Sequence, residues 1–234
     1  MAHDATAAEL KVLASPASRE AYSELLPPFE GATGYKVAVT WSGTQNIRKQ
    51  ITAGEVYDLV IAARSELDEL VTRGAIVPQS RVDLMKSAVG AAVRAGALKP
   101  DIVSGATLKK TLLAARSIGY SSGPSGAHMT ELFERMGIAD KIKAKVKQTP
   151  AGMRVASLIA SGEVEIGFQQ VSELVTERGI DYIGRLPAEV QNITVFAAGI
   201  HRQAREPQAA QELVKYFISP ASVSVIIKHG LEPP

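Results

Sequence analysis

The chain has 234 residues, of which 46% are hydrophobic and 21% charged, and its formal net charge is +2. This composition is typical of a globular chain long enough for one large domain or two modest lobes. The small net charge, the lack of lysine- or arginine-rich blocks and the 5% aromatic content argue against a nucleic-acid-binding protein. The absence of cysteine excludes disulfides, thiolate metal sites and cysteine nucleophiles.

Neither a membrane-spanning run nor a secretory signal is visible. No stretch approaches the roughly 18 apolar residues that a membrane span needs. The start, Met1 to Glu9, is polar and alanine-rich, as in a mature protein that has gained a new initiating methionine. We therefore expect a periplasmic protein whose signal peptide is missing, with a cytoplasmic protein as the alternative.

Strand-like and helix-like runs alternate along the first third of the chain. The expected strands are 10–14, 35–41 and 58–63, and the expected helices are 18–29, 46–53 and 65–73. Gly54 and Gly74 end the second and third of these helices, and Pro27-Pro28 stands near the end of the first.

The same alternation continues to the end. The expected strands are 88–94, 117–120, 145–148, 165–170 and 193–198, and the expected helices are 106–115, 127–136, 153–161, 207–218 and 221–228. This order predicts an α/β fold with largely parallel sheets. Residues 86–92 and 191–197 have the small and β-branched side chains expected of hinge strands. They predict one lobe from residues 9–87 plus 195–234 and another from 88–194.

Four turns rich in small and hydroxyl residues each follow an apolar run and precede a helix. They are residues 15–18, 42–45, 122–126 and 150–154. A helix start presents unpaired N–H groups and a partial positive charge, so these turns predict an anion-binding site. The candidate ligand-binding residues are Ser15, Ser18, Ser42, Gly43, Thr44, Ser122, Ser125 and Gly126. Helix capping is the alternative role for the serines.

Two arginines and one histidine adjoin these turns. The planar guanidinium groups of Arg19 and Arg154 suit a carboxylate, although a solvated Arg19 and a helix salt bridge for Arg154 are the alternatives. His128 lies in the first turn of a helix, where an imidazole is a candidate acid or base, or simply a surface group. Trp41 either walls the site or packs in the core. No spacing of histidines and carboxylates predicts a metal site, and no cofactor is expected.

Several segments resemble a known family. They are Leu10–Ser18 (LKVLASPAS), the stretch from Gln50-Ile51 through Asp58-Leu59 to Ala62, Pro124-Ser125-Gly126, Glu165-Ile166-Gly167 and Ser219-Pro220-Ala221. The chain resembles the type II periplasmic solute-binding proteins, and in particular the molybdate-binding proteins of ABC transporters, over about residues 9–232. The resemblance implies two α/β lobes with a ligand cleft between them and a chain that crosses twice.

The resemblance also implies positions for the site. Ala17, flanked by Ser15 and Ser18, falls at the first serine of molybdate binders, Gly43 or Thr44 at the second, Ser125 at the third loop, Met153 at the fourth, and Gln170 at a tyrosine. Gln169 and Gln170 face opposite sides of a strand, so only one of them can face the cleft, and Gln170 is chosen because it falls at the tyrosine position. The anion-binding frame is kept while its side chains differ, so a small organic carboxylate is as plausible as a tetrahedral oxyanion.

Two functions follow from the resemblance. The first is a monomeric receptor that captures a small anion and presents it to an ABC permease. The second is an aconitate isomerase, an activity known among relatives of molybdate-binding proteins, with His128 as the nominal base. A cytoplasmic anion sensor without a permease is a third possibility.

Overall fold

The computed structural model describes residues 9–150 and 152–234. Most of the polar start and Ala151, in the fourth expected turn, lie outside the described residues. The chain forms two compact units. Unit 1 contains the residues up to Met85, Val195–Lys228 and Glu232–Pro234, and unit 2 contains Lys86–Thr194 and His229–Leu231. Within the described ranges, no helix is long and apolar enough to cross a membrane.

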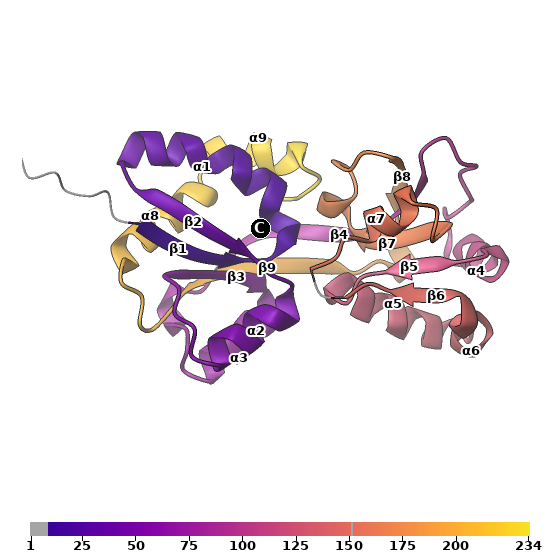
Figure 1. Cartoon of the computed structure of the whole chain (residues 1–234), viewed down its shortest axis with the longest axis horizontal. Helices are drawn as coiled ribbons and strands as arrows, with labels where there is room; N and C mark the ends of the chain where they lie inside the picture. The colour runs from indigo at the N-terminus through magenta and orange to yellow at the C-terminus, as the bar shows by residue number, and fades with distance from the viewer. Residues whose placement is uncertain (1–8, 151) are drawn as a thin grey trace, which may run out of the picture. The chain divides into compact units, whose positions relative to one another are not determined.

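The elements of unit 1 confirm the expected α/β class (Figure 1). Its strands are β1 (Glu9–Ala14), β2 (Lys36–Trp41), β3 (Leu59–Ala63) and most of β9 (Ile193–Ile200). Its helices are α1 (Arg19–Thr33), α2 (Thr44–Thr52), α3 (Arg64–Thr72), α8 (Pro207–Phe217) and α9 (Pro220–Lys228), with 3-10 turns η1 (Pro16–Ser18) and η2 (Pro78–Ser80).

Unit 2 is built on the same alternation. Its strands are most of β4 (Val82–Arg94), β5 (Ile118–Tyr120), β6 (Val146–Gln148), β7 (Ile166–Gln170) and β8 (Ile180–Arg185). Its helices are α4 (Gly105–Ala114), α5 (Pro124–Arg135), α6 (Ala139–Ile142) and α7 (Val155–Ala160), with 3-10 turns η3 (Lys143–Lys145), η4 (Val171–Glu173) and η5 (Ala188–Val190). Strands β4 and β9 each carry the chain from one unit into the other.

The sheets are mixed rather than largely parallel. In unit 1, β1 pairs in parallel with β2 and β3, while β9 is antiparallel to β3. In unit 2, β5 pairs in parallel with β6 and β7, while β4 is antiparallel to β7 and β8. The parallel strands place their carboxyl ends together within each unit, which is where open α/β sheets bind ligands.

Helices cover both faces of each sheet. In unit 1, α1, α8 and α9 lie on one face, and α2 and α3 on the other (Figure 1). Leu13, Val60 and Ala62 pack with Ile47 of α2 and Leu67 of α3. In unit 2, neighbouring residues of β4 serve separate cores: Ala91 and Val93 belong to the one that contains α4 and α5 residues, and Ala92 to the one that contains α7 residues. This alternation is why β4 is apolar on both sides.

Helix α1 is longer than expected. It runs through Pro27-Pro28 and ends at Thr33, where Gly34 adopts a left-handed conformation with φ +79°. Both prolines are exposed, so water can satisfy the carbonyl groups that lack a helical N–H donor. Beyond them, the Phe29 ring is buried and lies 5.6 Å from that of Tyr216, and this packing favours continuing the helix.

Asp58 and His201 are buried polar side chains of unit 1 that have hydrogen-bond partners. The Asp58 carboxylate accepts N–H groups from Lys11 at 2.8 Å, Arg205 at 2.7 Å and Glu206 at 2.9 Å, which joins β1 to the start of α8. His201 Nδ1 accepts the N–H of Gln203 at 3.2 Å. Burial lowers the pKa of His201, and the nearby Asp58 charge opposes that shift.

Tyr22 is also buried in unit 1. Its ring stacks on that of Phe217 with centroids 3.8 Å apart. Its buried hydroxyl has no hydrogen-bond partner among the described residues, and burial raises the pKa of Tyr22.

Candidate anion-binding site

In unit 1, the first two expected turns leave the same edge of the sheet. Ala14 and Trp41, the last residues of β1 and β2, are partners in the strand register. The Ser15 N–H donates to the Ile61 carbonyl at 2.8 Å, and the Ser42 N–H donates to the Ala14 carbonyl at 3.0 Å. Parallel pairing therefore brings residues 15–18 and 42–45 together at the carboxyl ends of three strands.

The serines of the first turn are engaged locally. Ser15 Oγ accepts the N–H of Ala17 at 3.4 Å, and Ser18 Oγ donates to the Ser15 carbonyl at 2.8 Å. Both side chains are buried. Ser15 thus caps the 3-10 turn through its oxygen and keeps its O–H as a donor, whereas the Ser18 O–H is used by the Ser15 carbonyl group.

The second turn leads directly into α2. Gly43 precedes the helix with extended backbone, and Thr44 is its first residue. The N–H groups of Thr44 and Gln45 precede the first helical hydrogen bond and have no acceptor within α2. The start of α2 therefore offers backbone donors beside Ser42.

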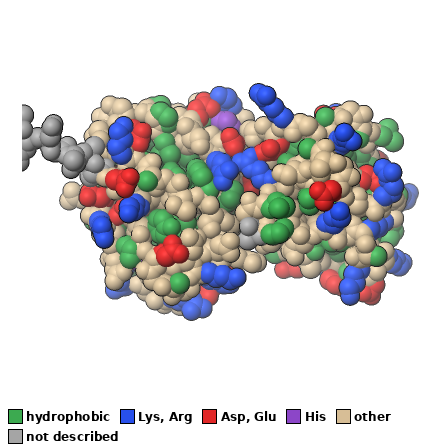
Figure 2. Space-filling view, viewed as in Figure 1, with side chains coloured by type: hydrophobic (Ala, Val, Ile, Leu, Met, Phe, Trp, Pro, Cys, Tyr) green, Lys and Arg blue, Asp and Glu red, His purple; other side chains and the backbone are tan. Residues whose placement is uncertain are grey.

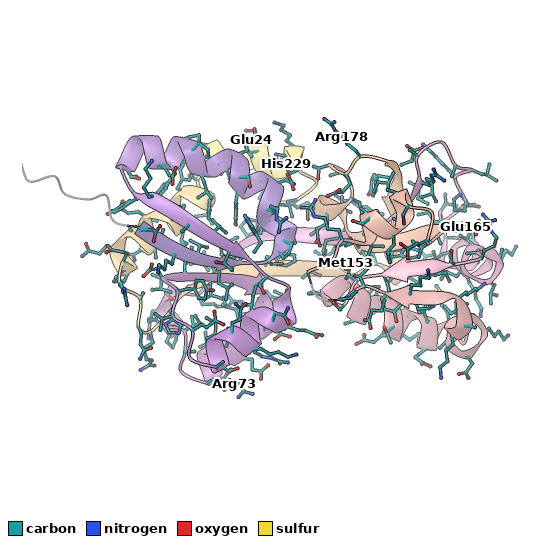
Figure 3. All side chains as sticks on the ribbon, viewed as in Figure 1. Glu24, Arg73, Met153, Glu165, Arg178 and His229 are labelled. Atoms are coloured by element: carbon teal, nitrogen blue, oxygen red, sulfur yellow. The ribbon has the colours of Figure 1, made fainter. Side chains whose placement is uncertain are left out.

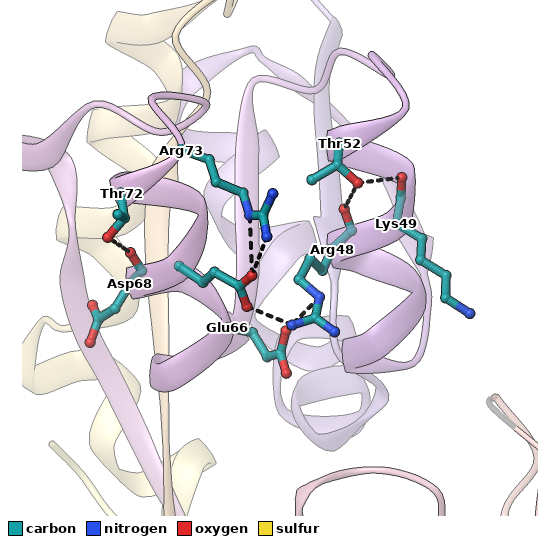
Figure 4. A network of polar contacts seen from close by, with 8 residues as sticks. Arg48, Lys49, Thr52, Glu66, Asp68, Thr72 and Arg73 are labelled. Carbon is teal, nitrogen blue, oxygen red and sulfur yellow. Dashed lines mark hydrogen bonds and ion pairs between the residues drawn. The ribbon is translucent and has the colours of Figure 1, made fainter.

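The arginines of unit 1 differ in their surroundings. The guanidinium carbon of Arg19 lies 5.4 Å from the Trp41 ring centroid, so the expected candidate Arg19 belongs to this edge. Arg48, on α2, pairs with Glu66 at 3.4 Å and with Glu69, which also binds Arg73 (Figure 4). Its hydrogen bond to Glu69 raises the pKa of Arg48. Arg48 thus links α2 to α3.

In unit 2, a second group of candidates lies at the carboxyl ends of β5 and β6. The Thr149 N–H donates to the Tyr120 carbonyl at 2.9 Å, which joins these strand ends. Ser121 Oγ and Ser125 Oγ are 2.9 Å apart, and the Gly123 N–H donates to Ser121 Oγ at 3.3 Å. Ser122 belongs to the same turn, which leads into α5 at Pro124.

Gly126 allows this turn to close on its helix. A Cβ atom at residue 126 would lie 1.5 Å from the Ser121 carbonyl oxygen. Only glycine accommodates that backbone approach. The space that a side chain at residue 126 would need is thus taken by the protein's own Ser121 carbonyl group.

The start of α7 is bound by neighbouring side chains. Arg154 forms an ion pair with Glu177, which is the alternative considered for this residue. The N–H of Val155 donates to Gln169 Oε1 at 2.9 Å, and Gln169 Nε2 donates to Glu173 at 2.9 Å. Met153 is 47% exposed (Figure 3).

Gln169 and Gln170 face opposite sides of β7. Gln170 is buried, and in the orientation that satisfies its amide, Nε2 donates to the carbonyl groups of Ser87 and Ala88 at 3.1 and 3.3 Å. Its Oε1 accepts the Thr194 hydroxyl at 2.9 Å. The structure therefore places Gln169, rather than Gln170, beside Val155 at the start of α7. The alternation of side chains along a strand predicts that the two residues face opposite sides. It does not predict which neighbour each one contacts.

His128 lies in α5 with 8% of its surface exposed. Its Nε2 is 2.8 Å from the Val190 carbonyl oxygen, so this nitrogen carries the proton and Nδ1 is the acceptor in the neutral ring. Within the described residues, no group of three or more potential ligand side chains could hold a metal ion.

Comparison with known proteins identifies the family. Residues 10–232 match the family model of bacterial extracellular solute-binding proteins, and the chain belongs to this family. It is 36% identical to an aconitate isomerase from a Pseudomonas species, over 96% of this chain and 87% of the relative. It is 27% identical to the molybdate-binding protein ModA of Azotobacter vinelandii, over 97% of this chain and 90% of the relative.

A solved structure shows the same fold. The periplasmic molybdate-binding protein of Azotobacter vinelandii superposes with a TM-score of 0.82 and 22% sequence identity, covering 96% of this chain and 99% of that protein. The resemblance stated from the sequence is therefore confirmed.

Proposed function

We propose that the protein is a solute receptor that binds a small anion through the helix starts at the strand ends of its units. The observation that carries the proposal is the meeting of Ser15, Ser42, the start of α2 and Arg19 at one edge of the unit 1 sheet. Backbone N–H groups, hydroxyls and a guanidinium are the donors that an anion requires. The molybdate-binding relatives support this role.

The proposed ligand is a small organic polycarboxylate rather than a tetrahedral oxyanion. Arg19 supplies a planar pair of donors that matches a carboxylate. The relative that is 36% identical acts on aconitate, a tricarboxylate, whereas the molybdate-binding relative is 27% identical. In a receptor, closure around such a ligand would present it to an ABC permease in the periplasm, and the monomer would suffice.

A second candidate function is aconitate isomerase, and the same 36% identity favours it. The reaction removes a proton from one carbon of the allylic system, shifts the C=C bond and returns a proton to another carbon. Such a reaction requires carboxylate-binding groups and a general base. His128 Nδ1 is the candidate base, because Nε2 faces the Val190 carbonyl group.

The test is calorimetry of the protein with molybdate, tungstate, sulfate, citrate, cis-aconitate and trans-aconitate, while proton NMR follows the aconitate samples. Tight aconitate binding without interconversion supports the receptor, and interconversion supports the isomerase. Binding of molybdate or tungstate alone would refute the carboxylate ligand, and no binding at all would refute the anion receptor.

His128→Ala separates the two functions. A receptor should bind aconitate about as tightly as the original protein, whereas an isomerase should lose about 10²–10⁴-fold in turnover. If aconitate is interconverted and the variant retains full turnover, His128 is not the base.

A further inference from the structure

Trp41, the only tryptophan of the chain, ends β2 at the edge that carries the unit 1 turns. Its register with Ala14 fixes its backbone beside Ser15. Trp41 also lies among the apolar residues Ala14, Tyr22 and Ile61. The strand therefore fixes the backbone of Trp41, and apolar neighbours adjoin its half-buried side chain.

Arg19 is the first residue of α1, and its guanidinium carbon is 5.4 Å from the Trp41 ring centroid. This separation is within the range of an attractive cation–π contact. Such a contact acts through the positive charge of the guanidinium and the face of the ring. Trp41 thus restricts the position of Arg19 at this edge.

We propose that Trp41 is a positioning residue that holds Arg19 in the orientation that binds a carboxylate of the ligand. The inference rests on the proposed polycarboxylate receptor and adds a residue to its site. A long arginine side chain loses rotamer freedom when it binds, and an arginine already held by an aromatic ring loses less. Two parallel N–H···O bonds to a planar carboxylate need that fixed orientation.

The same geometry predicts an optical signal. A carboxylate that pairs with Arg19 changes the electrostatic field a few ångströms from the indole. Since the chain has one tryptophan, its fluorescence should change on titration with trans-aconitate and saturate at the calorimetric dissociation constant.

The experiment is a double-mutant cycle in which calorimetry measures trans-aconitate binding to the full chain and its Trp41→Leu, Arg19→Lys and doubly substituted variants. Loss of the cation–π contact should weaken binding by about 3- to 30-fold in Trp41→Leu. Arg19→Lys keeps the charge but removes the planar pair of donors, so the losses should be less than multiplicative in the double variant. Arg73→Lys, the same change on an exposed arginine of unit 1, should bind as the original protein does.

Trp41→Phe keeps an aromatic ring and provides a second test if Trp41→Leu does not fold. Arg19→Lys should cost less affinity in the Trp41→Phe protein than in the original protein. Equal losses in both backgrounds, an unchanged affinity in Trp41→Leu, or unchanged fluorescence during a titration that calorimetry shows to bind would overturn the role of Trp41. Failure of the original protein to bind any aconitate would instead overturn the proposed ligand, and the role of Trp41 with it.

Discussion

Gly126 offers a sharp test of how the unit 2 turn is built. In Gly126→Ala, the new methyl carbon would lie 1.5 Å from the Ser121 carbonyl oxygen and 2.5 Å from its carbon. Both atoms belong to the backbone, so no change of rotamer can relieve the overlap. The turn must move away from α5, which separates the Ser121 and Ser125 hydroxyls from their present 2.9 Å contact.

The expected cost lies near the upper end of the overpacking range, at about 3 kcal/mol. For chains of 150–250 residues, 1 kcal/mol shifts the melting temperature by about 2–4 °C. Gly126→Ala should therefore lower the melting temperature by about 6–12 °C in differential scanning calorimetry.

Gly123→Ala is the matched control in the same turn. Its Cβ would meet only Ser121 Oγ, at 3.7 Å, and its backbone is extended with φ −84°. This variant should melt within about 4 °C of the original protein, since a substitution that introduces no strain changes stability by less than about 1 kcal/mol. If Gly126→Ala melts with Gly123→Ala or with the original protein, the reasoning from backbone overlap is refuted.

Three further substitutions test the buried polar groups of unit 1. Tyr22→Phe removes a hydroxyl that has no partner among the described residues, so calorimetry should show unchanged stability or a gain of up to about 1 kcal/mol; a loss of 2 kcal/mol would reveal a missed partner. Asp58→Ala leaves three backbone N–H groups without their charged acceptor and should cost about 3 kcal/mol or more in urea unfolding; a cost below 1 kcal/mol would contradict the stabilising role of these three hydrogen bonds. Because the pKa of His201 is lowered in the fold, its contribution is complete above the unfolded pKa of about 6.5 and is lost as the pH falls through the folded value. His201→Gln should therefore reduce the decline in melting temperature between about pH 7 and pH 5; an identical decline in both proteins would assign it to other groups.

Most elements could be predicted because their signals are local. Periodicity located α2 and α3, and Gly54 and Gly74 follow their ends with positive φ. Strand β8, at Ile180–Arg185, was not expected, because its hydrophobic pattern is interrupted. It forms a strand through pairing with β4. The extension of α1 from residue 29 to Thr33 likewise depends on tertiary packing, including that of Phe29.

The candidate site was predictable in kind rather than in detail. Small and hydroxyl residues after apolar runs located the turns, since open α/β sheets bind ligands at the carboxyl ends of their strands. The partners of individual side chains depend on distant residues: Glu177 for Arg154, Val190 for His128 and Trp41 for Arg19. Surface charge does not mark the position of an anion site, because basic and acidic side chains are interspersed on the face shown in Figure 2.

The discontinuity of unit 1 has a consequence for biosynthesis. Strand β3 pairs with β9, yet residues 86–194, almost all of unit 2, stand between unit 1's two main segments. During synthesis, the ribosome therefore completes the strands of unit 2 before it makes β9, the last strand of the unit 1 sheet. Since domains with complete sequences tend to fold as they leave the ribosome, we expect unit 2 to fold first and unit 1 to close around a chain whose middle is already native. The short segment His229–Leu231, which returns to unit 2 after α9, would then be among the last parts to dock, with Gly230 (φ +73°) fitting against Val171 and Val175.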